Sequence, residues 1–427
     1  MSNIPTGYKQ TEVGVIPEEW TISSIKNVAI IKTGPFGTML KASEYSSQQK
    51  GVPVISVGEI RQGYIRIVED TPFVCDKVTK RLSQYVLSTG NIVFARKGGV
   101  DRSAVISEKE NGWFLGSDGI ALSLNGKLCS EFLGFQFGSD RVQQALLQRS
   151  TGTTMPSMNQ EILGSVEIVL PPLPEQKRIA QVLGDVDALI QKLEAFIAKK
   201  RDIKQAAMQE LLTGKRRLPG FNGPWETKKL HEISGFITKG ATPTTSGFRW
   251  EASGVLFLRS ECVSEKGLIL DEAMHISLDA HFSQKRSEVF SGDILITITG
   301  NVGRVILVPT FSDNININQH IAIIRITDKN VNTSFIYHYM KQPPVVKSWL
   351  KIVTGQAYPQ ISLEQVRDYS VPLPFLPEQT AIAQVLSDMD AELAQLETRL
   401  TKTRDMKAGL MQELLTGKIR LGVKSNV

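Results

Sequence analysis

Six loops carry the residues best suited to chemistry in this chain of 427 residues, three in each half. They combine Gly, Thr and Ser with Arg, Lys, Asn or Gln. Basic side chains neutralise phosphates, glycine permits close backbone approach, and Arg, Asn and Gln hydrogen-bond to base edges. Any one loop alone fits an ordinary exposed turn, but six at corresponding places predict a DNA-binding surface. The candidate DNA-binding residues are Thr33, Gly34, Phe36, Arg96, Lys97, Arg102, Arg149, Thr151 and Thr153 in the first half, and Lys239, Thr242, Thr244, Arg249, Arg304, Gln356, Tyr358 and Gln360 in the second.

Motifs for catalysis are missing from the sequence. It contains no G-x-x-x-x-G-K-[ST] phosphate loop, no G-x-G-x-x-G loop after a strand, and no metal-ligand spacing among its five histidines. Acidic-x-Lys tripeptides starting at Glu175, Asp202 and Asp405 resemble part of a nuclease site. They fall in predicted helices, however, where charge pairing on the helix surface explains them more simply. We therefore expect a non-catalytic chain that uses no cofactor and no metal.

The loops must be positioned by a scaffold that occurs twice. Residues 174–218 and 377–421 align without a gap at a constant offset of 203 residues, and 27 of the 45 positions are identical. Each copy has a proline at its start and a Thr-Gly-Lys sequence at its end, which are typical helix boundaries. Each copy is therefore predicted to form one helix of nearly 40 residues, roughly 55–60 Å long at 1.5 Å per residue.

Both predicted helices carry an apolar stripe with alternating steps of three and four residues, as in a coiled coil. Polar residues interrupt it at Lys200 and Lys204 in the first copy and at Thr403 and Lys407 in the second. Two separate core helices are the alternative, but their length and register favour pairing of the copies with each other. The expected helix–helix seam consists of Leu183, Val186, Ile190, Leu193 and Ile197, and of Leu386, Met389, Leu393, Leu396 and Leu400.

The segments between the helices differ in kind. Short runs rich in β-branched residues, such as 52–57, 91–95, 294–298 and 321–326, are bounded by Gly, Asn, Asp or Ser and predict strands. A fainter repeat joins the two segments, for example Trp20 with Trp225. The expected fold is α+β, with two mixed domains of strong β content. The expected boundaries are 1–170 for the first domain, 171–218 for the first helix, 219–372 for the second domain, 373–421 for the second helix and 422–427 for a tail.

The composition of the chain bears on its binding partner and on its location in the cell. Its net charge of +6 and pI near 9.0 favour a polyanionic partner without proving one. No apolar run approaches the roughly 18 residues of a membrane span, and the first residues lack the layout of a signal peptide. The three cysteines lie far apart. A reducing cytoplasm is therefore the expected location.

Taken together, these features resemble a specificity subunit of a type I restriction–modification system. The resemblance spans the chain and is carried by residues 8–20 (YKQTEVGVIPEEW), by the helix entries PPLPEQ and PFLPEQ ending at Gln176 and Gln379, by the two QELLTGK exits, and by residues 217–221 (RLPGF). It implies two target-recognition domains, each reading half of a split double-stranded DNA site, separated by two long antiparallel helices. It also implies docking of two modification subunits, which methylate adenine, and two ATP-dependent restriction subunits.

Two other functions are compatible with parts of the pattern. A self-contained enzyme of type II character would need nuclease and methyltransferase residues that the sequence lacks. A scaffold that binds proteins through its β-rich domains would need no affinity for DNA. The steep salt dependence of DNA binding separates a DNA reader from such a scaffold.

Overall fold

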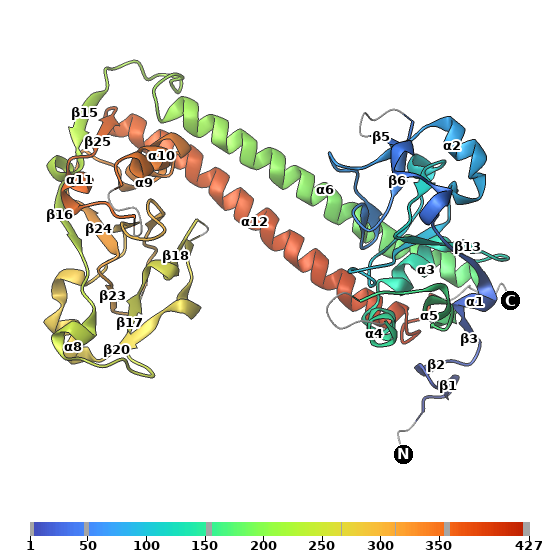
Figure 1. Cartoon of the computed structure of the whole chain (residues 1–427). Helices are drawn as coiled ribbons and strands as arrows, with labels where there is room; N and C mark the ends of the chain where they lie inside the picture. Colours follow the sequence, from blue (N-terminus) through green and yellow to red (C-terminus); the bar gives the residue numbers. More distant parts are fainter. Residues whose placement is uncertain are drawn as a thin grey trace. The chain divides into compact units, whose positions relative to one another are not determined.

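The computed structural model of the chain describes residues 4–46, 51–150, 156–265, 267–311, 313–353 and 359–421 (Figure 1). The chain forms two compact units. Unit 1 comprises Met1–Leu193 and Arg399–Val427, and unit 2 comprises Glu194–Thr398. Two helices of 39 residues each, α6 (Leu173–Leu211) and α12 (Leu376–Leu414), contribute to both units. Each unit therefore contains one β-rich domain together with the start of one long helix and the end of the other.

Unit 1 is organised around two four-stranded sheets, with strand orders β11-β10-β13-β4 and β12-β6-β9-β5. Three pairs, β1-β2, β14-β3 and β7-β8, complete its strands. The strands are β1 (Tyr8–Thr11), β2 (Gly14–Pro17), β3 (Thr21–Ser24), β4 (Ala29–Thr33), β5 (Tyr45–Ser46), β6 (Val52–Ile55), β7 (Ile60–Arg61), β8 (Tyr64–Ile65), β9 (Phe73–Val74), β10 (Ile92–Ala95), β11 (Ser103–Val105), β12 (Phe114–Leu115), β13 (Gly119–Leu124) and β14 (Glu167–Leu170). Its shorter α-helices are α1 (Ile25–Val28), α2 (Asp76–Arg81), α3 (Ser130–Phe137), α4 (Asp140–Arg149) and α5 (Gln160–Gly164).

Unit 2 repeats the larger sheet with the order β16-β24-β21-β22 and adds a three-stranded sheet, β20-β17-β23. Two pairs, β15-β25 and β18-β19, complete it. The strands are β15 (Glu226–Lys229), β16 (Ser234–Lys239), β17 (Val255–Leu258), β18 (Val263–Ser264), β19 (Gly267–Leu268), β20 (Met274–Ile276), β21 (Ile294–Thr297), β22 (Val305–Leu307), β23 (Ile315–Ile317), β24 (Ile321–Ile326) and β25 (Ser370–Leu373). The shorter α-helices are α7 (Leu230–Ile233), α8 (Leu278–Ser283), α9 (Thr333–Met340), α10 (Pro343–Lys351) and α11 (Leu363–Arg367).

The central strands β10 and β21 are apolar except for Thr297, because both of their faces are covered. Every residue of β10 and of β21 is buried. In unit 1, one core packs Trp20, Phe94 and Phe132 against Leu183 of α6 and Leu414 of α12. The equivalent core of unit 2 includes the opposite ends of the same helices. Each long helix is therefore held at each end by the core of one β-rich domain.

Both long helices end where the sequence predicts. The chain leaves α6 at Gly214, with φ of 70°, and leaves α12 at Gly417, with φ of 74°. A left-handed conformation of this kind is accessible to glycine at little cost, so it closes the helix without strain. Among the described residues, no helix is both long enough and apolar enough to cross a membrane.

Candidate nucleic-acid interface

One edge of the sheet β11-β10-β13-β4 in unit 1 brings together two of the predicted loops and one further turn. Ala95 at the end of β10 pairs with Gly119 at the start of β13, and Thr33 at the end of β4 pairs with Ile120. Because these strands are antiparallel, the end of β4, the β10–β11 turn and the β12–β13 turn lie together. We call this place the loop edge of unit 1. Gln160, at the start of α5, also reaches it and donates from Nε2 to Thr33 Oγ1 at 3.0 Å.

Lys97, Arg102 and Phe36 are the predicted side chains that best fit a binding role at this edge. The Lys97 side chain is 50% exposed and lies 3.4 Å from the carboxylate of Asp118. Arg102 folds back onto its own turn, since a Cβ at Gly99 would lie 2.1 Å from Arg102 Nε. Phe36 is 63% exposed. Two basic side chains and an exposed aromatic ring therefore lie close to glycines of the loop edge. Lys97 and Arg102 flank Gly98 and Gly99, and Phe36 follows Gly34.

Unit 2 builds the same edge from the equivalent elements. Thr297 at the end of β21 pairs with Ile321, and Lys239 at the end of β16 pairs with Ala322. Thr242 donates to the side-chain oxygen of Gln319, whose amide nitrogen lies 3.1 Å from Nε2 of His320. The loop edge of unit 2 therefore presents the amide of Gln319 and the imidazole of His320 on the turn that carries Asp118 in unit 1.

A hollow of about 670 Å³ lies beside the β21–β22 turn of unit 2. Arg304, Lys341 and Lys347 line it, together with Gly300 and neighbouring residues of the turn. Arg304 is partly engaged, because its Nη1 donates to the backbone oxygen of Val263 at 3.2 Å. The hollow is thus basic, but its Arg304 guanidinium is directed inward.

Some predicted residues lie apart from these edges or cannot be placed. Arg149 ends α4 and lines a small hollow with Glu12 and Arg141, next to the N-terminal β1-β2 pair. Arg249 is exposed on the segment before β17. Thr244 lies in a 3-10 turn, Pro243–Ser246. Gln360, in contrast, lies at the loop edge of unit 2, where it forms an isolated bridge with Thr299 of the β21–β22 turn. Four predicted residues lie outside the described part of the chain: Thr151, Thr153, Gln356 and Tyr358.

Gly34, one of the predicted DNA-binding residues, has a structural role at the loop edge. A Cβ at Gly34 would lie 1.8 Å from the backbone oxygen of Gly116, and a Cβ at Gly240 in unit 2 would lie 1.8 Å from the oxygen of Ile317. Such a contact is impossible, so a glycine is required where the two turns touch. These residues shape the loop edges without offering a side chain to a ligand.

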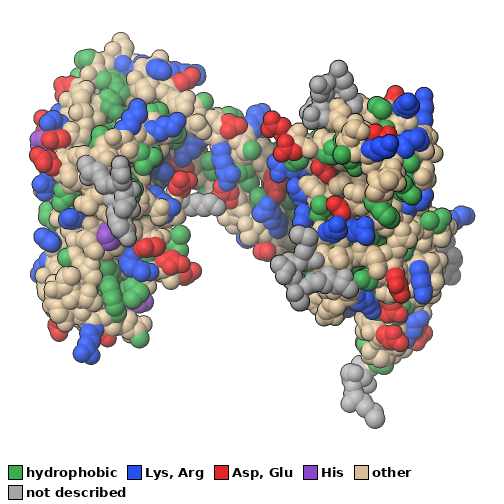
Figure 2. Space-filling model, in the orientation of Figure 1, with side chains coloured by type: hydrophobic (Ala, Val, Ile, Leu, Met, Phe, Trp, Pro, Cys, Tyr) green, Lys and Arg blue, Asp and Glu red, His purple; other side chains and the backbone are tan. Residues whose placement is uncertain are grey.

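The sequence reasoning missed three side chains at the edges: Asp118, Gln319 and His320. They occupy the short turns between β12 and β13 and between β23 and β24, which lack the basic residues that marked the other loops. A usable signal was present in Gly116 and Gly119, which surround Asp118 and indicate a close backbone approach. Charge distribution would not have found them. On the face drawn in Figure 2, Lys and Arg side chains are interspersed with Asp and Glu.

The long helices run antiparallel to each other, as their contacts within each unit show. In unit 1, Lys407 Nζ of α12 lies 2.6 Å from Asp187 Oδ1 of α6. In unit 2, Lys204 of α6 forms the same ion pair with Asp390 of α12. The two pairs join repeat-equivalent residues, 203 positions apart. The three lysines that interrupt the apolar stripe, Lys200, Lys204 and Lys407, thus form ion pairs between the helices, whereas Thr403 donates to a backbone oxygen of its own helix.

The predicted seam residues are buried to different extents in the two helices. Leu183, Val186, Leu193 and Ile197 of α6 are all at most 9% exposed, whereas only Leu386 is equally buried on α12. The remaining seam residues are half-buried, namely Ile190 of α6 and Met389, Leu393, Leu396 and Leu400 of α12.

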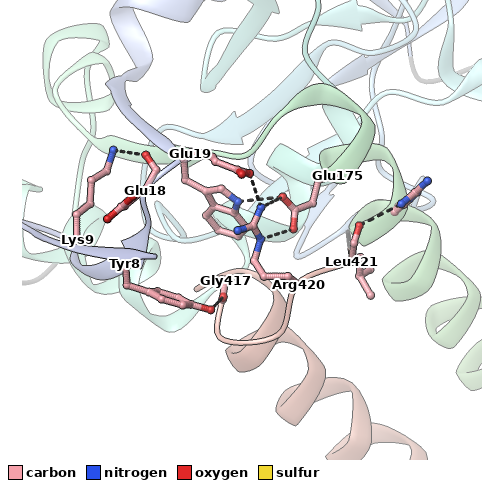
Figure 3. Close-up of polar contacts among 10 residues, drawn as sticks. Tyr8, Lys9, Glu18, Glu19, Glu175, Gly417, Arg420 and Leu421 are labelled. Carbon is pink, nitrogen blue, oxygen red and sulfur yellow. Dashed lines mark hydrogen bonds and ion pairs between the residues drawn. The ribbon is translucent and has the colours of Figure 1, made fainter. Parts of the chain in front are cut away.

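A second pair of repeat-equivalent contacts lies where each unit joins the start of one long helix to the segment after the other. Figure 3 shows the contact of unit 1. In unit 1, Arg420 donates from Nε and Nη2 to the two carboxylate oxygens of Glu175, at 2.8 and 2.9 Å. Trp20 Nε1 also donates to Glu175, at 3.0 Å, and the Arg420 guanidinium lies 5.7 Å from the Trp20 ring centre. These bonds to Glu175 raise the pKa of Arg420 further above its usual range. We call this the closing contact of unit 1.

Unit 2 has the matching closing contact. Arg217 donates to both carboxylate oxygens of Glu378, at 2.5 and 2.6 Å, and lies 5.6 Å from the Trp225 ring centre. Glu175, which begins an acidic-x-Lys tripeptide, is therefore occupied by structural partners. Among the described residues, no cluster of three or more His, Cys, Asp or Glu side chains could hold a metal ion.

His338 of α9 makes unit 2 sensitive to pH. The side chain is buried beside α12, with Nε2 3.1 Å from Ser387 Oγ. Burial lowers the pKa of His338 to about 4; Asp390 opposes this shift, while Lys204 and Lys341 add to it. The unfolded chain, with a histidine pKa near 6.5, binds more protons between these values. We therefore expect unit 2 to lose up to about 3 kcal/mol of stability as the pH falls from about 6.5 to about 4.

Urea unfolding between pH 7 and pH 4 measures this effect. H338F is the informative variant, because the repeat-equivalent position in unit 1 is Phe135, and it should remove most of the pH dependence in unit 2. H231F is the control, since His231 is 47% exposed in its side chain. An unchanged pH dependence in H338F would contradict the assignment.

The comparisons with known proteins agree with this architecture. Residues 17–202 and 222–403 match the model of the type I restriction modification DNA specificity domain. The chain is 26% identical over 433 residues to a Methanocaldococcus jannaschii chain assigned as the specificity subunit of the type I restriction enzyme MjaX, covering 97% of both. It is 23% identical to the EcoBI specificity subunit of Escherichia coli, covering 95% of this chain and 86% of that one.

Solved structures show the same fold. The S subunit of a type I restriction–modification system from M. genitalium superposes with a TM-score of 0.60, at 16% identity, over 92% of this chain and 96% of that one. A chain from a structural study of complex assembly and conformational transition in the type I system gives a TM-score of 0.56, at 17% identity, over 95% and 99%.

The chain belongs to the family of type I restriction–modification DNA specificity domains and contains that domain twice. It is a DNA specificity subunit, the non-catalytic part of a type I restriction–modification enzyme. The expected α+β fold, with two mixed domains and two long paired helices, is confirmed.

Proposed function

We propose that each unit reads one half of a bipartite double-stranded DNA site through its loop edge. The observation that carries this proposal is the pair of loop edges themselves. They occur on the same strand order in both units, yet they present different side chains. Two domains with the same strand arrangement, but with different side chains at their loop edges, are suited to bind two different half-sites.

The long helices take the role of spacer and platform in this proposal. Each of them is continuous over 39 residues and is anchored in both cores. We assign to their repeated surfaces the docking of two modification subunits, which methylate adenine in the recognised site. Two restriction subunits, with ATP-dependent translocation and cleavage, join that assembly in the cytoplasm.

Salt dependence tests DNA reading directly. If each loop edge neutralises about three phosphates, raising salt from 50 to 200 mM should weaken binding to a random duplex about 10³-fold. Removing one phosphate contact should make the slope of log affinity against log salt about 0.9 shallower. We expect this for K97A in unit 1, measured by fluorescence anisotropy on the chain assembled with its modification subunit.

K127A supplies the matched control. Lys127 is exposed and follows the opposite end of β13, away from the loop edge. It should leave both affinity and slope unchanged. A wild-type slope near zero would point instead to a scaffold that binds only proteins.

A further inference from the structure

The two loop edges share a backbone hydrogen bond at one equivalent position. In unit 1 the N–H of Arg96 donates to the backbone oxygen of Asp118 at 2.9 Å. In unit 2 the N–H of Ile298 donates to the backbone oxygen of His320 at 2.8 Å. Residues 118 and 320 therefore occupy one position of the common frame, just before the inner strands β13 and β24.

The turns that carry these residues are fixed from their other side as well. Gly34 N–H donates to the oxygen of Gly119 at 3.0 Å, and Gly240 N–H donates to the oxygen of Asn318 at 3.2 Å. Hydrogen bonds from both sides hold the backbone in place. The side chains at this position can change without moving the turn.

The side chains at this common position and directly before it differ in hydrogen-bonding character between the two units. Asp118 is a carboxylate that only accepts, and it is 37% exposed in its side chain beside a 50% exposed Lys97. An ion pair this exposed is weak, so the carboxylate is available to a ligand. In unit 2, Gln319 precedes His320 and carries an amide that both donates and accepts.

The Gln319 amide makes two hydrogen bonds within the protein, one at its oxygen and one at its nitrogen. Its oxygen accepts from Thr242, and its nitrogen is hydrogen-bonded to the ring of His320. An amide has two hydrogens and two lone pairs, so one of each remains for a ligand. That pair matches N7 and N6 of adenine in the major groove, whereas a carboxylate matches the N4 amino group of cytosine.

We propose that Asp118 in unit 1 and Gln319 in unit 2, which directly precedes His320 at the position equivalent to Asp118, are base-reading residues on corresponding turns. This inference rests on the proposed function and extends it by naming residues and a base for each. Unit 1 would read a cytosine through Asp118, and unit 2 would read an adenine through Gln319.

The test uses D118A and Q319A in the chain assembled with its modification subunit. First, mapping of methylated adenines in DNA modified by the wild-type complex defines both half-sites. Competition among duplexes, changed one base pair at a time, then measures discrimination at every position. A good base contact is worth about 1–3 kcal/mol, so each variant should lose about 5- to 150-fold discrimination at one position of one half-site.

E108Q is the control for the change of charge. Glu108 is exposed and follows the far end of β11, so its replacement should leave every position unchanged. Loss confined to one position of one half-site, a different half-site for each variant, supports the inference. Unchanged discrimination, or a uniform loss over all sequences, overturns it.

The proposed function and the assignment of Asp118 and Gln319 are contradicted by different results. A wild-type complex that modifies no bipartite site contradicts the proposed function itself. A wild-type complex with a defined bipartite site, but with D118A and Q319A reading it as before, contradicts only the assignment of these residues.

Discussion

Replacing Arg420 by alanine is expected to lower the stability of unit 1 by about 3–5 kcal/mol, because it leaves a buried carboxylate without its charged partner. Glu175 is only 3% exposed and receives both bonds from the Arg420 guanidinium. In the variant, the indole N–H of Trp20 is the remaining donor to this carboxylate among the bonds described for it. Amide hydrogen exchange in urea, followed separately for the two units, measures the loss.

The repeat provides its own controls for R420A. Unit 2 is closed by Arg217 and Glu378, so its exchange should remain at the wild-type level. R217A should show the reverse pattern, with unit 2 destabilised and unit 1 unaffected. K229A removes an ion pair with Asp368 in which both side chains are about half exposed, and should cost less than about 1 kcal/mol. Similar losses of stability for R420A and K229A would show that the closing contact stabilises its unit no more than an exposed ion pair does.

Lengthening both long helices by one heptad is expected to change the DNA spacer without changing either half-site. Seven residues add about 10.5 Å to a helix, close to the rise of three base pairs at about 3.4 Å each. Because a heptad preserves the apolar stripe, the seam and its ion pairs can form again on both sides of the insertion. The insertions belong after Glu194 in α6 and after Thr398 in α12, at the boundaries between the units.

Mapping of methylated adenines in the modified DNA gives the result. A spacer longer by about three base pairs, with both half-sites retained, is the expected outcome. A heptad inserted in α6 alone is the control. It displaces Lys204 from Asp390 by two helical turns and should abolish modification. An unchanged spacer in the double insertion would exclude the helices as the element that sets it.

The helices were predictable because their signals are local and repeated. Leu173–Leu211 and Leu376–Leu414 begin and end within a few residues of the proline and glycine boundaries. The strand predicted at 321–326 coincides with β24, and that at 91–95 with β10 to within one residue. A run of β-branched residues between turns identifies a buried strand, whatever the rest of the chain does.

The loop edges were only partly predictable because side-chain direction depends on distant residues. The charge of Arg304 predicts a ligand contact, but Val263, 41 residues away, accepts a hydrogen bond from its guanidinium. Asp118 was overlooked because its turn is short and not basic. Its role becomes visible only when strand pairing brings Arg96 against it. Composition identifies loops that could bind DNA, whereas the pairing of strands decides which side chains meet there.

The closing contacts also determine what a single copy of the repeat can do. Each contact joins the glutamate of one copy to the arginine of the other, so neither copy closes a unit with its own residues. A fragment with one β-rich domain and one long helix would carry both an unpaired Glu and an unpaired Arg. Two such fragments satisfy each other, and the duplicated gene can be understood as a covalent homodimer whose halves were then free to diverge in what they read.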